Sequence, residues 1–240
     1  MTFSPAAADI EANLREIRRR LDRAARVADR NPADVQLIAI SKTFAAEAVR
    51  HAYAAGQRAF GENRVQEALQ KIGAIEDLAL EWHLVGHLQT NKARKAAASF
   101  QWIHSVDRVE LLEQIDRAAA DQGTQPQLLI QVDLAKEPTK FGAPVHLVRT
   151  LFEEAGKCRA ARVVGLMLLP PFADDPEAVR PYFQALSELR DTLGLEGIPA
   201  SMLRHLSMGM SHDFEVAVQE GATMVRIGTA IFGGRAVALA

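Results

Sequence analysis

The chain contains a single cysteine among its 240 residues, so Cys158 has no internal partner for a disulfide bond. The 28 lysines and arginines nearly balance the 30 aspartates and glutamates, and a net charge of -2 gives no electrostatic footprint for nucleic acid. No apolar run is long enough to cross a bilayer. The segment from Met1 to Ile10 lacks the basic and apolar stretches of a signal peptide. We therefore expect a cytoplasmic protein without nucleic-acid or membrane partners.

What the chain does contain is a regular alternation of short apolar runs and amphipathic stretches, about one strand and helix per 30 residues. This cadence predicts an α/β protein with the architecture of a (β/α)8 TIM barrel, with an open doubly wound sheet as the alternative. We predict strands near residues 36–41, 58–61, 82–86, 101–105, 127–133, 163–168, 203–207 and 223–227. We predict helices near residues 45–55, 63–72, 89–98, 107–120, 144–157, 175–193 and 212–220, and one more after Gly228.

The chain shows no long linker, low-complexity segment or internal repeat. We therefore expect residues 1–240 to form one barrel domain, with an extra N-terminal helix in residues 1–31 packed on it. Arginines crowd that helix, but acidic residues interleave with them, which favours a solvated face over a nucleic-acid surface.

Lys42 follows the first predicted strand, which is short, apolar and rich in branched residues. A lysine at the end of a buried strand is partly desolvated, which lowers the pKa of an amine and favours Schiff-base chemistry. The alternative is an ordinary lysine that extends to the surface from a strand end.

The last two predicted strands are followed by residues suited to a phosphate group. Gly228 permits close backbone approach, and Thr229 begins a helix whose backbone N–H groups attract an anion. Ser207 and Ser211 offer hydroxyl groups, with Gly209 between them. Each signal alone is also explained by helix capping or ordinary turn chemistry. A phosphate site opposite a desolvated lysine suggests pyridoxal 5′-phosphate (PLP), which needs both groups.

Long ordered motifs then carry a resemblance that covers nearly the whole chain. They read AISKT (39–43), FGENRVQE (60–67), WHLVGHLQTNK (82–92), IHSVD (103–107), GLM (165–167), LSMGMS (206–211) and VRIGTAIFG (225–233). On these motifs the chain resembles the YggS/PROSC family of PLP-binding proteins, also called PLP homeostasis proteins.

The resemblance implies a barrel similar to the N-terminal domain of alanine racemase, with Lys42 holding PLP as an internal aldimine. It places Arg226 beside the pyridine nitrogen, and it matches Lys140 to a family lysine near the mouth of the pocket, with a role in cofactor transfer. It places Ser211, Gly228 and Thr229 at the phosphate, and Asn63, His83 and Met208 on the lining of the pocket. Ser207, noted above as a hydroxyl donor, completes the expected cofactor-binding residues. The chain departs from the family pattern at Phe44-Ala45 and at His212, and these departures bear on the rate of cofactor exchange and on affinity more than on the identity of the cofactor.

The residues favour a PLP carrier over a catalyst. An arginine beside the pyridine nitrogen disfavours its protonation, so the ring becomes a weak electron sink. Racemisation also needs a second acid or base, and the only tyrosines, Tyr53 and Tyr182, fall in predicted outer helices. We expect a protein that carries or buffers PLP in vitamin B6 and amino-acid homeostasis without robust turnover, acting as a monomer and supplying apo PLP-dependent enzymes.

Two alternatives remain at this stage. One is a weak PLP-dependent amino-acid racemase that uses His83, His104 or Lys140 as the second base. The other is a cofactor-free aldolase that forms a Schiff base at its lysine. A metal site at His83 and His87 is disfavoured because the pair falls in a strand and turn rather than on a helix.

Overall fold

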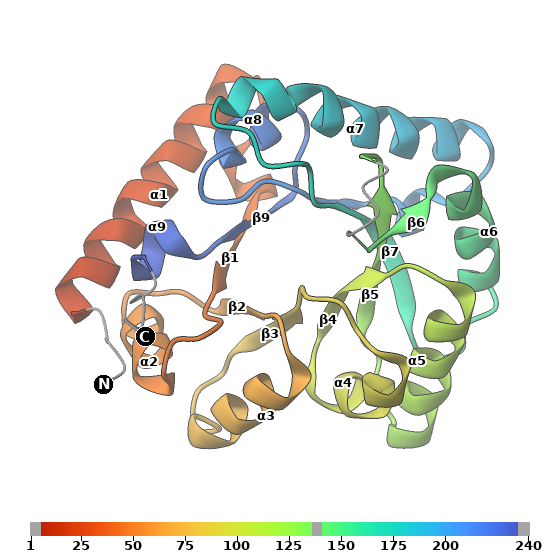
Figure 1. Ribbon diagram of the computed structural model, residues 1–240, viewed down its shortest axis with the longest axis horizontal. Helices are drawn as coiled ribbons and strands as arrows, with labels where there is room; N and C mark the ends of the chain where they lie inside the picture. Colours follow the sequence, from red (N-terminus) through yellow and green to blue (C-terminus); the bar gives the residue numbers. More distant parts are fainter. Residues whose placement is uncertain (1–5, 136–140, 235–240) are drawn as a thin grey trace, which may run out of the picture.

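The strands close into a parallel barrel, as Figure 1 shows in this computed structural model, which describes residues 6–135 and 141–234. Going round the ring, β1 pairs with β2, then β3, β4, β5, β7, β8 and β9, and β9 pairs again with β1. The predicted TIM barrel is therefore confirmed, and the open sheet is excluded. The strands of the ring are β1 (Gln36–Ile40), β2 (Ala59–Glu62), β3 (Glu81–Leu84), β4 (Trp102–Val106), β5 (Gln127–Asp133), β7 (Arg162–Leu168), β8 (His205–Ser207) and β9 (Met224–Ile227).

Helices follow the strands and surround the barrel (Figure 1). Their bounds are α1 (Ala7–Val27), α2 (Ala46–Ala54), α3 (Val65–Ala74), α4 (Ala93–Ser99), α5 (Val109–Gln122), α6 (Val145–Ala155), α7 (Arg180–Leu195), α8 (Phe214–Gln219) and α9 (Thr229–Phe232). Short 3-10 turns precede β1, α4, α7 and β8, and a two-residue strand β6 (Ala143–Pro144) pairs with β5 outside the ring. In the described part of the chain, no helix has the length and apolar character needed to span a membrane.

The extra N-terminal helix α1 packs on the outside of the barrel. Its apolar stripe includes Ile10, Leu14 and Ile17, which are all almost completely buried. The helix contacts α2, α8 and α9 (Figure 1). Since α9 follows the last strand, α1 braces the region where the barrel closes.

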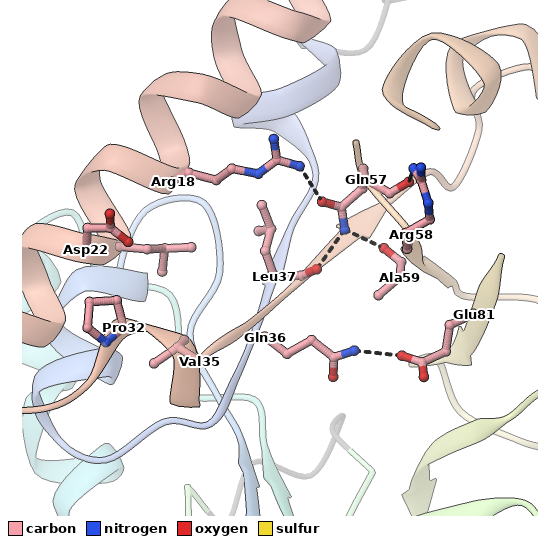
Figure 2. A pocket seen from close by; sticks show the side chains of 11 residues that line it. Arg18, Asp22, Pro32, Val35, Gln36, Leu37, Gln57, Arg58, Ala59 and Glu81 are labelled. Carbon is pink, nitrogen blue, oxygen red and sulfur yellow. Dashed lines mark hydrogen bonds between the residues drawn. The ribbon is translucent and has the colours of Figure 1, made fainter. Parts of the chain in front are cut away.

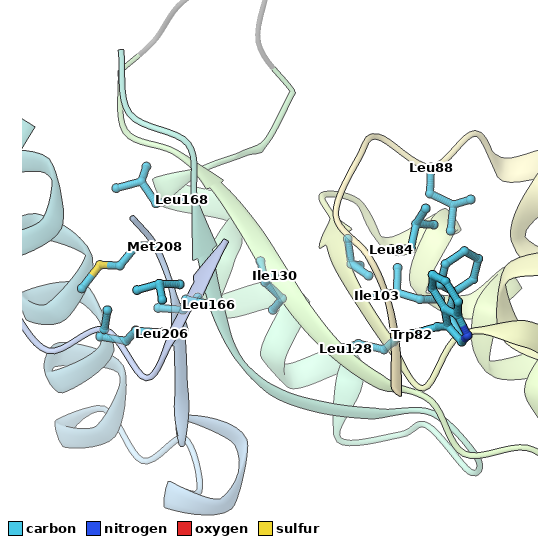
Figure 3. Packing of buried hydrophobic residues seen from close by; sticks show 14 of the residues in the cluster. Trp82, Leu84, Leu88, Ile103, Leu128, Ile130, Leu166, Leu168, Leu206 and Met208 are labelled. Atoms are coloured by element: carbon cyan, nitrogen blue, oxygen red, sulfur yellow. The ribbon is translucent and has the colours of Figure 1, made fainter. Parts of the chain in front are cut away.

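Side chains alternate along each strand between two separate cores. In β1, Leu37 and Ala39 face outward to the helices, whereas Ile38 and Ile40 face the barrel interior. The outward set forms the large layer between strands and helices, part of which is drawn in Figure 3. The inward apolar set is small. A TIM barrel interior is usually filled by branched aliphatic side chains, but here polar and aromatic groups take much of that space.

The N-terminal end of the barrel has its own cavity, of about 410 Å³, beneath α1. Figure 2 shows Gln36 of β1 and Glu81 of β3 on its wall, joined by a hydrogen bond from Gln36 Nε2 to Glu81 Oε1 of 2.6 Å. The side chain of Gln57 seals the neighbouring wall, because its amide donates to the carbonyls of Leu37 and Ala59 (Figure 2). This end of the barrel therefore holds ordered polar groups that contact solvent.

Candidate functional site

A larger cavity, of about 590 Å³, opens at the C-terminal ends of the strands. Active sites of this fold lie at that end, where the loops after the strands meet. Six of the residues that the sequence singled out line this cavity together: Lys42, Asn63, Ser211, Arg226, Gly228 and Thr229.

Lys42 lies directly after β1, in a tight turn. The backbone N–H of Phe44 donates to the carbonyl of Ser41 at 3.1 Å, which closes the turn around Lys42 and Thr43. Thr43 has a φ of 68°, a left-handed conformation that this kind of turn normally gives to glycine. A β-branched residue there stores strain of about 1–3 kcal/mol. Backbone strain of this kind is concentrated at functional sites, and here it positions the half-buried lysine toward the cavity.

A buried ion pair holds the residue just before Lys42 from the outer side of the barrel wall. Glu62 at the end of β2 is fully buried and pairs with Lys71 of α3, which is 8% exposed. The Ser41 hydroxyl donates to Glu62 Oε1 at 2.7 Å, and Lys71 Nζ donates to the Ser41 carbonyl at 2.7 Å. The hydroxyl and the carbonyl of Ser41 are thereby both fixed. This pair was not predicted from the sequence, although a charged residue at a strand end followed nine positions later by a lysine on a helix is a signal for it.

Arg226 forms the floor of the cavity. Its Nη1 donates to the Ser207 hydroxyl at 2.6 Å and its Nη2 to the Leu168 carbonyl at 2.8 Å. Burial lowers the pKa of the guanidinium to about 10, while the nearby Asp213 carboxylate opposes that shift. Burial likewise raises the pKa of Asp213, whose carboxylate accepts a hydrogen bond from the Met210 backbone N–H at 2.6 Å. Arg226 remains charged at neutral pH and is held in one orientation.

The Ser211 hydroxyl and backbone N–H groups form the polar wall at the end of β9. The Ser211 hydroxyl oxygen accepts hydrogen bonds from the backbone N–H groups of Gly228 at 3.3 Å and Ala230 at 3.4 Å, which leaves its own hydrogen available to donate. A Cβ at position 228 would lie 3.2 Å from the Ile40 carbonyl oxygen, which is tighter than normal packing. Glycine therefore lets the backbone of this segment lie close against β1. Donors of this kind are suited to an oxyanion.

Aromatic rings form the rim of the cavity. The rings of His87 and Phe141 are stacked, with their centroids 3.6 Å apart. Phe172 is 81% exposed and lies near His212, whose Nε2 contacts the Asp174 carbonyl at 2.8 Å. Of these rim residues the sequence analysis named His87, as part of a disfavoured metal pair, and the departure His212, which both line the cavity. The others come from loops whose paths no periodicity predicts.

Three described residues that were predicted to bind the cofactor do not line the cavity. Met208 is fully buried and belongs to the outer core (Figure 3), because the preceding residue Ser207 faces inward and alternation turns Met208 outward. His83 does face inward, but it lies deeper in the barrel, fully buried against the ring of Trp102. Ser207 lies below the cavity and contacts it only through Arg226. Lys140 falls outside the described residues.

The three histidines named in the alternatives lie in two places, two of them inside the barrel and one at the rim of the cavity. His83 and His104 hydrogen-bond each other inside the barrel, with 3.0 Å between their ring nitrogens. His87 lies at the rim against Phe141. His83 and His87 therefore do not converge on one point, and neither interior histidine reaches the cavity.

Residues 10–236 match the family model described as "Alanine racemase, N-terminal domain". The fold is also similar to alanine racemase from Corynebacterium glutamicum, with a TM-score of 0.73 at 17% identity, covering 99% of this chain and 64% of that chain. At that identity the likeness shows the fold alone. The class defined by fold and site is thus a barrel of the alanine racemase N-terminal type.

Closer relatives narrow this class. The chain is 45% identical over 222 residues to the pyridoxal phosphate homeostasis protein of Aquifex aeolicus, covering 92% of this chain and 96% of that protein. It is 38% identical to the protein of the same name from Escherichia coli, covering 95% and 97%. The structure of PipY of Synechococcus elongatus with PLP bound has a TM-score of 0.80 at 42% identity, covering 89% of this chain and all of that chain. The chain belongs to the family of pyridoxal phosphate homeostasis proteins.

Proposed function

We propose that this protein binds PLP in the cavity at the C-terminal end of the barrel and carries or buffers it without robust turnover. The observation that supports this function is that one cavity is lined by an amine, a buried guanidinium and a set of anion-binding donors. Lys42 supplies the amine, Arg226 the guanidinium, and Ser211 with the adjoining backbone N–H groups the donors. The relatives named above include one whose structure holds PLP.

The residues present fit this cofactor. A volume of about 590 Å³ lies within the usual size of a small-molecule pocket. The amine of Lys42 would hold the aldehyde carbon covalently, and Ser211 with the N–H groups of Gly228 and Ala230 would bind the phosphate. Arg226 would face the pyridine nitrogen. Asn63 would complete the pocket wall.

The same residues favour a carrier over an enzyme. Bound PLP supplies an electron sink for carbanion chemistry, but a charged arginine at its ring nitrogen weakens that sink. Both tyrosines lie on outer helices, Tyr53 on α2 and Tyr182 on α7, so neither can act as a second base in the cavity. The two interior histidines lie too deep to replace them. We therefore expect binding and release rather than a catalytic cycle.

An absorbance spectrum of the purified protein with added PLP tests the binding step. Wild-type protein should show an absorbance band at the edge of the visible range, and borohydride should remove it. Mass spectrometry should then find PLP attached to a peptide that contains Lys42. Lys42→Ala should lose both signals, whereas Lys157→Ala, which changes a lysine with a 70% exposed side chain, should keep them. A colourless wild-type protein would overturn the proposal and favour the cofactor-free lysine barrel.

Proton exchange at the α-carbon of amino acids tests the absence of turnover. Holo-protein in deuterated water should incorporate no more deuterium into alanine than PLP alone does. Sustained incorporation that disappears in Lys42→Ala would instead establish the weak racemase.

The remaining parts of the proposal concern the protein as a whole. One domain acts as a monomer in the cytoplasm and passes PLP to apo enzymes, and Lys140 assists that transfer. Sedimentation of the holo-protein would test the monomer, and transfer to an apo acceptor would test the delivery. An unchanged transfer rate in Lys140→Ala would remove that residue from the proposal.

A further inference from the structure

A continuous chain of hydrogen bonds crosses the barrel interior from the cofactor cavity to the opposite cavity. It begins at Arg226 Nη1, which donates to Ser207 Oγ at 2.6 Å. Ser207 Oγ lies 2.9 Å from His104 Nδ1, and His104 Nε2 lies 3.0 Å from His83 Nδ1. The last link joins His83 Nε2 to Glu81 Oε1 at 2.8 Å. The residues come from β9, β8, β4 and β3, and all except Glu81 are buried.

The two ends of this chain open on different cavities. Arg226 lines the cavity that holds Lys42, whereas Glu81 lines the smaller cavity at the N-terminal end of the barrel (Figure 2). The Glu81 side chain is 38% exposed there and also accepts from Gln36. Hydrogen bonds thus connect Arg226 in one cavity directly to Glu81 in the other.

Counting donors gives the chain one direction. A guanidinium can only donate, so the Ser207 oxygen accepts and its own hydrogen is available for His104 Nδ1. His104 then carries its hydrogen on Nε2 and donates to His83 Nδ1, and His83 donates from Nε2 to the Glu81 carboxylate. The reverse order would leave an unprotonated His83 nitrogen facing that carboxylate. Only the first order satisfies every group while Glu81 is ionised and both rings are neutral.

The environment supports these protonation states. Burial lowers the pKa of both imidazoles, and that of His104 falls well below its usual range, with the neighbouring His83, Arg226 and His205 adding to the effect. The hydrogen bond from His83 lowers the pKa of the Glu81 carboxyl. The Trp102 ring stacks on His83 with centroids 5.5 Å apart and an angle of 7° between planes, which closes one face of the ring.

We propose that Glu81 is a remote positioning residue for the cofactor site. Its carboxylate fixes the direction of the hydrogen-bond chain, and that direction orients the Ser207 hydroxyl. The hydroxyl in turn holds the guanidinium of Arg226 in the floor of the cavity. The role of Arg226 toward PLP rests on the function proposed above. Loss of the Glu81 carboxylate, the last acceptor of the hydrogen-bond chain, therefore changes how firmly Ser207 holds Arg226, although Glu81 lies at the opposite end of the barrel.

Nitrogen NMR of the protein labelled at histidine tests the direction without any cofactor. Both His83 and His104 should be neutral and carry their hydrogen on Nε2 in wild-type protein near neutral pH. A hydrogen on Nδ1 of His104 would overturn the proposal, and this result needs no variant to fold.

PLP titration of matched variants tests the consequence for the cofactor site. Glu81→Leu should weaken PLP affinity by roughly threefold to tenfold, the range expected for one net hydrogen bond, and shift the absorbance maximum of bound PLP. Glu81→Gln should restore both, because its amide oxygen still accepts from His83. Arg18→Ala changes the wall of the same N-terminal cavity without touching the chain and should behave as wild type.

The outcomes separate the two proposals. If wild-type protein binds PLP and Glu81→Leu binds it with unchanged affinity and spectrum, the positioning role is wrong and the proposed function stands. If wild-type protein does not bind PLP, the proposed function fails and the positioning role fails with it. Ser207→Ala should match Glu81→Leu, and the double variant should be no weaker than either, because both changes break the same chain.

Discussion

Replacing Lys71 with methionine would leave the carboxylate of Glu62 buried without its cation. The Glu62 side chain is 0% exposed, and among the described residues only its Oε1 atom has hydrogen-bond partners, Lys71 and the Ser41 hydroxyl. Removing one partner of a buried ion pair costs about 3–5 kcal/mol of folding free energy. We therefore expect Lys71→Met to lower the free energy of unfolding by about 3–5 kcal/mol at pH 7.

Urea unfolding followed by fluorescence and circular dichroism at pH 7 would measure this loss.

Two further variants make the test specific. Glu62→Gln added to Lys71→Met should recover most of the loss, because the neutral amide still accepts from Ser41. Lys157→Met breaks an exposed pair with Glu154 and should cost less than about 1 kcal/mol. A Lys71→Met loss below 1 kcal/mol at pH 7, or a double variant as unstable as the single one, would refute the reasoning.

Three more outcomes follow from the structure. Gly209→Ala should destabilise the fold by about 2–4 kcal/mol in urea unfolding, since φ is +92° and a Cβ would lie 2.6 Å from that of Ala217; Gly123→Ala, with φ of +67° and open space, should cost only about 1 kcal/mol. Burial raises the pKa of Cys158 to about 11, so alkylation by iodoacetamide should stay slow at pH 8 and accelerate only toward that value; fast labelling at pH 8 would contradict it. Burial lowers the pKa of the two interior histidines, so their contribution to stability should be present above about pH 6.5 and be lost as pH falls below it; an unfolding free energy that rises on acidification through that range would contradict this sign.

The sequence predicted the barrel closely because its signals are local. Branched apolar runs bounded by glycine and polar residues place each strand of the ring within two residues of its observed bounds. Lys42 and Gly228 lie at strand ends, so barrel closure alone brings them to one cavity. The two-residue strand β6 was missed because so short a segment has no periodicity.

The predicted site residues differ from the residues that line the cavity in depth and facing. Met208 and His83 were assigned to the pocket from their motifs, whereas the alternation of the strand and the height of the residue in the barrel decide what each side chain reaches. The chain of hydrogen bonds through His104 was not predicted either, because it joins β3, β4, β8 and β9, which are far apart in sequence. Such pairings depend on barrel register, which a single sequence does not encode locally.

The alternation of side chains also separates two kinds of evolutionary change. Ser207 and Met208 are neighbours in the chain, yet one contacts the floor of the cofactor cavity and the other packs against helices. Mutations that face the helices will be selected for how well the protein folds, and mutations that face the interior for how it handles its ligand. The side chains that face the helices and those that face the interior lie on opposite sides of a wall one backbone thick. Mutations in one set can therefore accumulate without disturbing the other, and relatives can change either folding stability or ligand handling while keeping the other unchanged.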